Sequence, residues 1–242
     1  MSDVIQNFDR AVAGYDAHSA PQAKLAAELA RWIAPGERRG RAVEFGAGTG
    51  LFTRRMQPWS GSYLATDAAP RMVELGRARC PSASWAILDA RQPATLDSVD
   101  WIFSCNLLQW LDDPEAAIKG WRKILVPRGQ LLAAVLVPGS LLELQSVLPD
   151  SSPLRWRTTD EWRVILRHSG FSIVHESVWE HREIYPHSLA FLHAIHAMGL
   201  APRRASRVGQ LRAALRAYDE KFAAPGGVFA TWRAWLVRAV AD

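Results

Sequence analysis

The stretch Val43-Glu44-Phe45-Gly46-Ala47-Gly48-Thr49-Gly50 decides the fold of this chain of 242 residues. Its apolar start is typical of a buried strand, and its three glycines stand where a strand gives way to a helix. Glycine at such a turn lets the backbone come close to a ligand. A dinucleotide-binding loop has its third glycine at the position of Leu51, so the spacing here differs from that motif. Glu44 precedes the first glycine by two residues, where it would repel a phosphate and suits a ligand that carries an amino group.

Two more acids follow the next two predicted strands. Asp67 closes the second strand, 23 residues after Glu44, a distance at which an acid can accept both hydroxyls of a ribose. Asp89 closes the third strand and can accept from the amino group of an adenine, with Leu88 and Ala90 beside the ring. A glycine loop followed by acids at successive strand ends predicts a nucleoside ligand with an amino group. This description favours S-adenosylmethionine over NAD.

Short apolar segments alternate with helical ones along the first two thirds of the chain. The pattern predicts an α/β fold, with helices on both faces of a parallel sheet. The predicted strands are 41–45, 62–66, 84–88, 99–105 and 130–137. The predicted helices are 21–33, one opened by Pro70, one opened by Asp113-Pro114, and one from Thr158 to Gly170.

The last third of the chain changes character. Residues 171–185 and 228–240 alternate and are rich in β-branched and aromatic side chains, which predicts two long strands. Helices are predicted between them at about 186–198 and 205–222. Two long strands after a parallel sheet indicate an antiparallel end to the sheet. We predict a single domain over residues 1–242, with a helical lid at about 1–35 and a helical insertion at about 139–170.

Composition excludes several classes of protein. A chain of this length can bury a core without disulfides or metals, and its two cysteines, Cys80 and Cys105, cannot form a disulfide framework. The first residues are polar, and the apolar run 131–137 is too short to span a bilayer. We therefore expect a cytoplasmic protein with no membrane partner.

With the glycine loop, Asp67 and Asp89 in successive positions, the chain resembles the class I S-adenosylmethionine-dependent methyltransferases over essentially its whole length. The resemblance implies a doubly wound, Rossmann-like sheet of seven mostly parallel strands, of which the last is antiparallel. It also implies that the cofactor lies across the first four strand ends. The expected cofactor-binding residues are Glu44, Gly46, Ala47, Gly48, Gly50, Asp67, Ala68, Met72, Asp89, Ala90 and Asn106.

Four other segments resemble a narrower family, the malonyl-acyl-carrier-protein O-methyltransferases of biotin synthesis. They are Phe8-Asp9-Arg10-Ala11 with Tyr15-Asp16, Asn106-Leu107-Leu108-Gln109-Trp110, Gly139-Ser140-Leu141-Leu142-Glu143-Leu144, and Leu192-His193-Ala194-Ile195-His196-Ala197-Met198-Gly199. Glu44 and Ala47 stand where family members usually have Asp and Cys, changes that should preserve cofactor binding. His193 and His196 replace residues that are usually basic in the family, which leaves the acyl carrier or acid open.

A malonyl carboxylate is ionised at neutral pH, so its methylation requires no general base. The resemblance then gives Tyr15, Gln109 and Trp110 positioning roles around the acceptor. The alternative is a methyltransferase of the same fold that acts on another small carboxylic acid or natural-product intermediate. We expect no metal site, because His193 and His196 lack a third ligand.

The net charge of +5 is confined to one end of the chain. Residues 1–198 hold 21 basic and 21 acidic residues, whereas residues 199–242 hold eight basic and three acidic ones. The arginines that stand there with no acid between them are Arg203, Arg204, Arg207, Arg212 and Arg216. They predict either a docking face for an acidic partner such as acyl carrier protein, or a solvated helix. A nucleic-acid partner is not expected, because 106–109 replace the loop with which such enzymes bind flipped bases.

Overall fold

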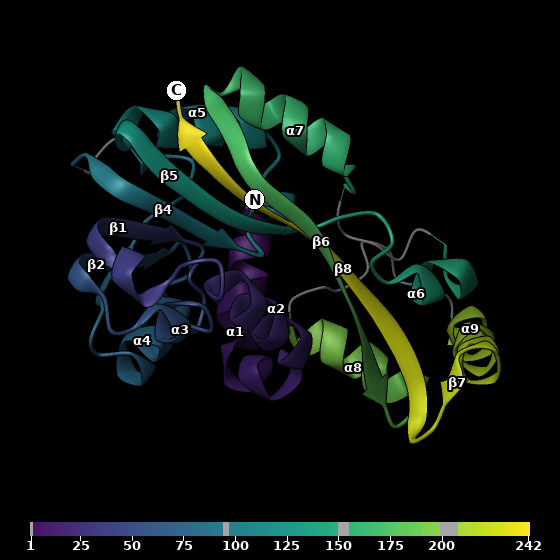
Figure 1. Ribbon diagram of the computed structural model, residues 1–242. Coiled ribbons are helices and arrows are strands. Elements are labelled where there is room, and N and C mark those ends of the chain that lie inside the picture. The colour runs from purple at the N-terminus through teal and green to yellow at the C-terminus, as the bar shows by residue number, and fades with distance from the viewer. Residues whose placement is uncertain (1, 94–96, 150–154, 199–207) are drawn as a thin grey trace.

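A computed structural model of the chain describes residues 2–93, 97–149, 155–198 and 208–242. Its centre is one sheet with the strand order β3-β2-β1-β4-β5-β8-β6 (Figure 1). Strands β1 to β5 pair in parallel, while β8 runs antiparallel to both β5 and β6. The strands are β1 (Arg39–Phe45), β2 (Ser60–Asp67), β3 (Ser84–Ile87), β4 (Val99–Cys105), β5 (Leu125–Leu136), β6 (Phe171–Tyr185) and β8 (Gly227–Ala241).

The predicted doubly wound, mostly parallel sheet with an antiparallel last strand is confirmed, and a two-residue strand, β7 (Ala223–Ala224), pairs with the start of β8. The fifth strand begins earlier than predicted, because Leu125 already pairs with Val99. The pairing then shifts register before Trp101 pairs with Gln130. In the intervening stretch Arg128 adopts a positive φ of 61°. Residues 126–129, which lie before the predicted strand, are therefore an irregular part of β5.

Alternate residues of the strands face two separate hydrophobic cores. On one face, α2 (Ala20–Ala30), α3 (Thr53–Met56) and α4 (Pro70–Arg79) cover Ala65 and Phe103. On the other face, α5 (Pro114–Ile124) and α7 (Thr159–His168) cover Val43 and Ile102. Because the central strands β4 and β5 are buried on both faces, they contain continuous apolar runs at residues 101–103 and 131–136.

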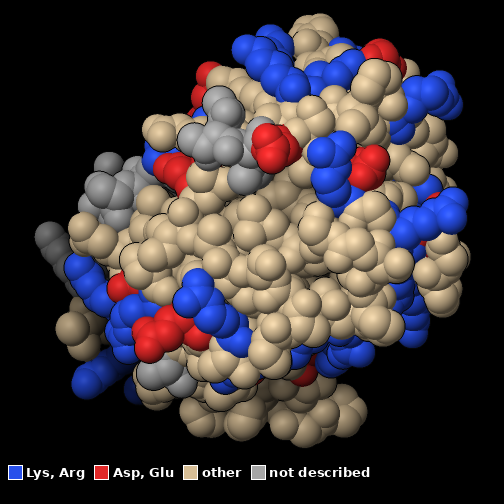
Figure 2. All heavy atoms as spheres, turned by 90° about the vertical axis from the view of Figure 1, so that its left-hand side faces the viewer, with Lys and Arg blue, Asp and Glu red and all other residues tan. Residues whose placement is uncertain are grey.

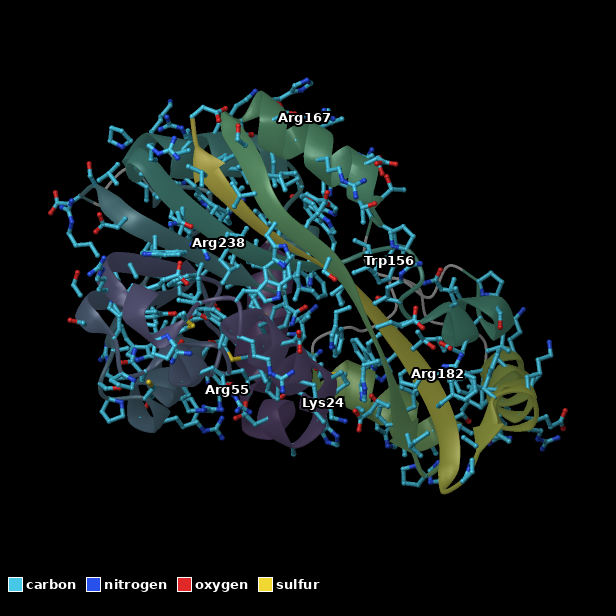
Figure 3. The ribbon with its side chains drawn as sticks, in the orientation of Figure 1. Lys24, Arg55, Trp156, Arg167, Arg182 and Arg238 are labelled. Atoms are coloured by element: carbon cyan, nitrogen blue, oxygen red, sulfur yellow. The ribbon has the colours of Figure 1, made fainter. Side chains whose placement is uncertain are left out.

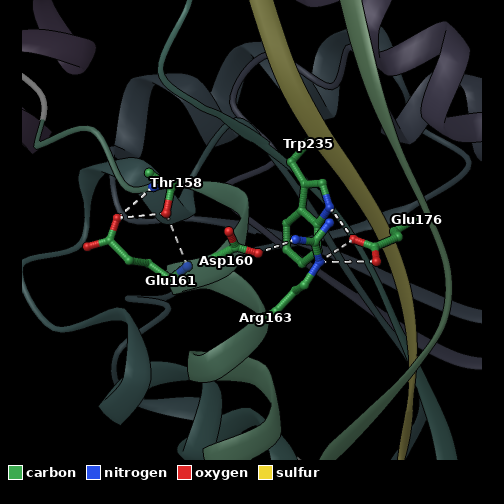
Figure 4. Close-up of polar contacts among 6 residues, drawn as sticks. All are labelled: Thr158, Asp160, Glu161, Arg163, Glu176 and Trp235. Carbon is green, nitrogen blue, oxygen red and sulfur yellow. Dashed lines mark hydrogen bonds and ion pairs between the residues drawn. The ribbon is translucent and has the colours of Figure 1, made fainter.

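Helix α7 is fixed at its start and along its side (Figure 4). Thr158 and Glu161 form a capping box, in which each side chain binds the backbone of the other residue. Arg163 bridges Asp160 on its own helix and Glu176 on β6, at 2.5 and 3.0 Å. Trp235 on β8 donates to the same Glu176 at 2.7 Å. These contacts hold α7 against the β6–β8 pair, within the segment 139–170.

Strands β6 and β8 form a long antiparallel pair that continues past the end of β5 (Figure 1). The extension carries α6 (Leu142–Val147), α8 (Ser188–Ala197) and α9 (Val208–Lys221). On α6, the buried Glu143 accepts hydrogen bonds from the backbone and the hydroxyl of Thr231 on β8. The start of the predicted helix 205–222, with Arg203, Arg204 and Arg207, lies outside the described residues.

Helix α1 (Ser2–His18) packs on α4 and α8, at the carboxyl ends of the parallel strands. Two ion pairs join the segment that follows α1 to the β6–β8 pair. Their basic members, Lys24 and Arg238, are labelled in Figure 3. Lys24 on α2 contacts Glu183 on β6 at 2.7 Å, and Arg238 on β8 contacts Glu37 at 2.6 Å. The two pairs thus tie α2 and the short turn that follows it, η1 (Pro35–Glu37), to the last strands of the sheet.

The surface mixes charges of both signs. On the face shown in Figure 2, basic and acidic side chains lie in small groups around a broad area of other residues. Within the described residues, no helix has the length and apolar character needed to cross a membrane.

Candidate active site

A pocket lies at the carboxyl ends of β1 to β5 and is covered by α1. Of the residues predicted to bind cofactor or acceptor, all except Gly50 line it. They are Tyr15, Glu44, Gly46, Ala47, Gly48, Asp67, Ala68, Met72, Asp89, Ala90, Asn106, Gln109 and Trp110. Gly50 has a positive φ of 86° and faces the indole ring of Trp85, 3.3 Å from where a Cβ would stand. Its position indicates a role in the turn of the loop.

The glycine loop presents its backbone to the pocket at Gly48. The residue has a φ of 55°, and a Cβ added there would meet no atom within 4 Å. The space in front of it is therefore open for a ligand to approach the main chain. The Gly48 amide donates to Oδ2 of Asp67 at 2.9 Å, which ties the loop to the end of β2.

Glu44, at the end of β1, is a buried carboxylate with two hydroxyl donors. Thr53 and Tyr63 both donate to its Oε2 at 2.7 Å. Burial raises the pKa of Glu44 to about 7, although the two hydrogen bonds oppose this shift. The side chain is 1% exposed and lines the pocket, so a cationic amino group placed there would stabilise its charged form.

The acids at the ends of β2 and β3 differ in what they already bind. Asp67 accepts from the amides of Gly48 and Ala69, both at 2.9 Å, and burial raises its pKa. A carboxylate oxygen has two lone pairs, so Asp67 keeps acceptor capacity for hydroxyls. Asp89 pairs with the guanidinium of Arg91, which lowers the pKa of Asp89. The cofactor half of the pocket, defined by Glu44, Gly48, Asp67 and Asp89, therefore fits S-adenosylmethionine.

Helix α1 covers the pocket and is held there by two aspartates. Asp16 accepts from the Thr49 hydroxyl of the glycine loop at 2.5 Å and pairs with Arg79 at the end of α4. Asp9 accepts from the backbone amide of Arg71 in the first turn of α4 at 2.8 Å. Both contacts close α1 over the strand ends.

A second group of lining residues, Tyr15, Cys105, Gln109 and Trp110, is the one that we expect to face the methyl acceptor, and we call it the acceptor half. Phe8 on α1 packs against the rings of Trp110 and Tyr15, with centroids 5.1 and 6.2 Å apart. Burial raises the pKa of both Tyr15 and Cys105 far above neutrality, so each keeps its proton. The acceptor half therefore presents aromatic rings and neutral polar groups.

The chain turns sharply between β4 and the acceptor half. Asn106 has a φ of 63°, a left-handed conformation that asparagine tolerates better than most residues, and its amide donates to Ala134 at 2.9 Å. The turn leads into the short helix η3 (Leu108–Trp110), which carries Gln109 and Trp110 into the lining. Gln109 donates back to the Asn106 carbonyl at 3.0 Å.

Several site residues were not predicted from the sequence. Thr53 and Tyr63 bind Glu44, Thr49 binds Asp16, and Gln22 lines the pocket. Of these residues and their partners, only Asp16 stands in a motif visible in the sequence, the Tyr15-Asp16 pair of the family resemblance. The others are ordinary polar residues whose roles depend on contacts made in the folded chain.

Known proteins match this chain in sequence and in fold. The family described as Methyltransferase domain matches residues 43–133, which run from β1 into β5 and include the glycine loop, Asp67 and Asp89. Solved structures of similar fold include a protein of Bacillus halodurans described as a methyltransferase, with a TM-score of 0.67 and 15% identity over 89% of this chain and 97% of that one. Fold and site define a class I methyltransferase whose cofactor is S-adenosylmethionine.

A curated relative gives the family. The malonyl-acyl-carrier-protein O-methyltransferase of Paenibacillus sp. (strain JDR-2) is 30% identical, over 96% of this chain and 95% of its own length. The chain belongs to the family of the malonyl-acyl-carrier-protein O-methyltransferases. Among solved structures, magnesium protoporphyrin IX methyltransferase of Synechocystis with bound S-adenosylhomocysteine has a TM-score of 0.59 and 14% identity, over 91% of this chain and 83% of that one.

Proposed function

We propose that this enzyme methylates the free carboxylate of a malonyl thioester carried by acyl carrier protein, as a step of biotin synthesis. The relatives that carry the name of this activity support the proposal. The observation that carries it is the lining of the acceptor half, where Tyr15, Cys105, Gln109 and Trp110 supply rings and neutral polar groups and no basic side chain stands among the described residues of the lining. An acceptor bound there must already be nucleophilic. A carboxylate meets this condition, because it is ionised at neutral pH.

S-adenosylmethionine supplies a methyl group on a positively charged sulfur. Tyr15 and Trp110 form walls that align the acceptor, and Gln109 orients it by hydrogen bonding. Helix α1 excludes water, which favours a reaction in which two opposite charges disappear. The residues of this chain therefore work by alignment and desolvation, and none of them has to remove a proton.

The carrier would dock on α9, which packs against α6, α8 and β8 on the extension of the sheet. Arg212 and Arg216 stand one turn apart on α9, and both are exposed. Acyl carrier proteins are acidic, so exposed arginines fit them electrostatically. Together with Arg203, Arg204 and Arg207, which lie outside the described residues, these side chains form the proposed docking face.

The decisive experiment is transfer of radiolabelled methyl from S-adenosylmethionine to a panel of malonyl thioesters and free diacids. We expect a base-labile methyl ester on malonyl-acyl carrier protein and on the smaller malonyl-CoA, with the carrier as the better acceptor. Labelling of free diacids alone would overturn the proposal and favour a small-acid methyltransferase of the same fold.

A further inference from the structure

Gln22 is a buried amide in the wall of the pocket. It stands in the first turn of α2, is 8% exposed, and lines the pocket beside Ala26 of the same helix. Its Nε2 donates to the sulfur of Met198 at 3.0 Å, and a thioether is a weak acceptor. Its Oε1 is buried with no hydrogen-bond partner among the described residues. A buried amide in this state is costly to the folded protein unless a ligand completes its hydrogen bonds.

The position of Gln22 assigns it to the acceptor and not to the cofactor. The cofactor half is built from the ends of β1, β2 and β3. Gln22 instead belongs to α2, which packs against β5, and its neighbours in the lining include Leu136 at the end of β5 and Met198 after α8. Because β4 and β5 lie on the far side of β1 from β2 and β3, this wall lies beyond the glycine loop.

The surroundings also decide what kind of group Gln22 can bind. In the described part of the chain, the pocket lining contains acidic and neutral side chains but no Lys, Arg or His. An anionic acceptor must therefore find its hydrogen bonds at neutral donors. Nε2 carries two hydrogens, and half a turn about the last side-chain bond exchanges Nε2 with the unpaired Oε1. A hydrogen bond to a carboxylate is stronger than one to a thioether, so an arriving anion would draw the NH2 group toward itself.

We propose that the side-chain amide of Gln22 binds the carboxylate of the methyl acceptor and so selects acids over neutral acyl groups. This inference rests on the proposed function and adds a specificity-determining residue to it. Gln22 lines the same pocket as Tyr15 and Trp110 and is, after Gln109, the second side-chain amide that orients the acyl group.

The test is calorimetric titration of malonyl-pantetheine into the protein saturated with S-adenosylhomocysteine, together with steady-state kinetics. The variant Gln22→Met keeps the length of the side chain and removes the amide. We expect the Kd and the KM of the acceptor to rise about tenfold or more, since hydrogen bonds to charged groups are worth at least that factor. The Kd of S-adenosylmethionine should stay within twofold of the wild-type value.

The matched control is Gln57→Met, because Gln57 also has a buried amide atom without a partner but lies outside the pocket lining. It should leave acceptor binding unchanged. The variant Gln22→Glu adds a negative charge, and should weaken binding of malonyl-pantetheine more than binding of its methyl ester. The ratio of the two losses in affinity, for malonyl-pantetheine and for its methyl ester, reports on charge. It would not change if Gln22 only supported the fold.

Two results would overturn the inference. One is a Gln22→Met protein that binds malonyl-pantetheine like the wild type; the other is an equal loss of cofactor and acceptor affinity, which would place Gln22 at the cofactor or in the core. If the wild-type protein itself does not bind malonyl-pantetheine, the proposed function fails, and this inference falls with it. If the wild-type protein binds malonyl-pantetheine and the Gln22 variants bind it equally well, the role of Gln22 is overturned and the proposed function is not.

Discussion

The carboxylate of Asp16 on α1 accepts a hydrogen bond of 2.5 Å from the hydroxyl of Thr49 in the glycine loop. The helix that covers the pocket is thus tied directly to the loop that approaches the cofactor. Thr49 is 1% exposed and the side chain of Asp16 24%, so the contact is partly shielded from water. Cover and cofactor site should therefore respond together when either of them changes.

Removal of this tie should speed release of the cofactor. For Asp16→Asn we expect the Kd of S-adenosylmethionine to rise about fivefold, or about 1 kcal/mol, mainly through a faster dissociation rate. Stopped-flow fluorescence measures that rate. Asp160→Asn breaks an ion pair on α7, away from the pocket, and serves as the control. An association rate that falls while the dissociation rate stays constant would contradict the role of Asp16 as a tether.

Cofactor binding should depend on pH through Glu44. Burial raises the pKa of Glu44 to about 7 in the free protein, and a bound amino group needs the ionised form. Affinity should therefore fall as the pH drops below about 7, by up to tenfold per pH unit, with a proton released on binding. Calorimetry in buffers of different ionisation enthalpy measures this proton. For Glu44→Gln we expect weak binding with no proton release; a wild-type affinity that is flat from pH 5.5 to 8 would exclude Glu44 as the ligand of the amino group.

The two strand-end acids should contribute unequally. Asp67→Ala should cost about 2–3 kcal/mol of cofactor affinity, since Asp67 keeps free acceptor capacity for hydroxyls and also supports Gly48. Asp89→Ala should cost less than about 1 kcal/mol, because the carboxylate of Asp89 already pairs with Arg91. Calorimetric titration of both variants compares them. Equal losses would show that Asp89 leaves Arg91 when the cofactor binds.

A methyl group on the glycine loop should block the cofactor without unfolding the protein. Gly48 and Gly226 both have positive φ, at 55° and 89°, and a Cβ at either position makes no clash. Substitution by Ala at either site should cost about 1 kcal/mol of stability from backbone strain. Only Gly48→Ala should weaken cofactor binding, by more than tenfold, because Gly226 lies in the turn between β7 and β8, outside the pocket lining. Thermal unfolding and calorimetry separate the two effects; normal binding by Gly48→Ala would mean that the ligand does not approach this loop.

The docking face should distinguish the carrier from small thioesters. Charge reversal of Arg203, Arg204 and Arg207 to Glu should raise the KM for malonyl-acyl carrier protein several-fold and reduce its dependence on salt. The same reversal of Arg212 and Arg216 tests the exposed side chains of α9. Malonyl-CoA should be affected less, because its carboxylate reaches the pocket without a protein contact. Equal losses on both substrates would indicate damage to the fold, and no loss on either would leave these arginines as a solvated surface.

The strands themselves and the glycines and acids of the pocket could be predicted from the sequence because they depend on local signals. Apolar strands, glycine spacing and an acid after each strand can be read from a few adjacent residues. This is why Glu44, Asp67 and Asp89 were found.

Other parts of the site depend on contacts between distant residues. Thr49 meets Asp16 across 33 positions, and Gln22 meets Met198 across 176. Asp16 and Met198 belong to segments of the family resemblance, but no local pattern marks Thr49 or Gln22 as their partners, and Gln22 falls only at the start of a predicted helix. The early start of β5 was missed for a related reason, since pairing with β4 outweighs the local effect of Pro127 and Gly129.

The place of β8 in the sheet has a consequence for how the chain assembles. It is the last strand of the sheet along the sequence, yet it lies between β5 and β6. While a ribosome is still synthesising residues 227–241, β5 has one open edge and the long strand β6 has no partner at all. Unpaired edges recruit other strands, so the nascent protein is exposed to aggregation until its final segment emerges. Truncations that remove β8 should accordingly yield insoluble protein, although the entire glycine loop and every acid of the cofactor half would still be present.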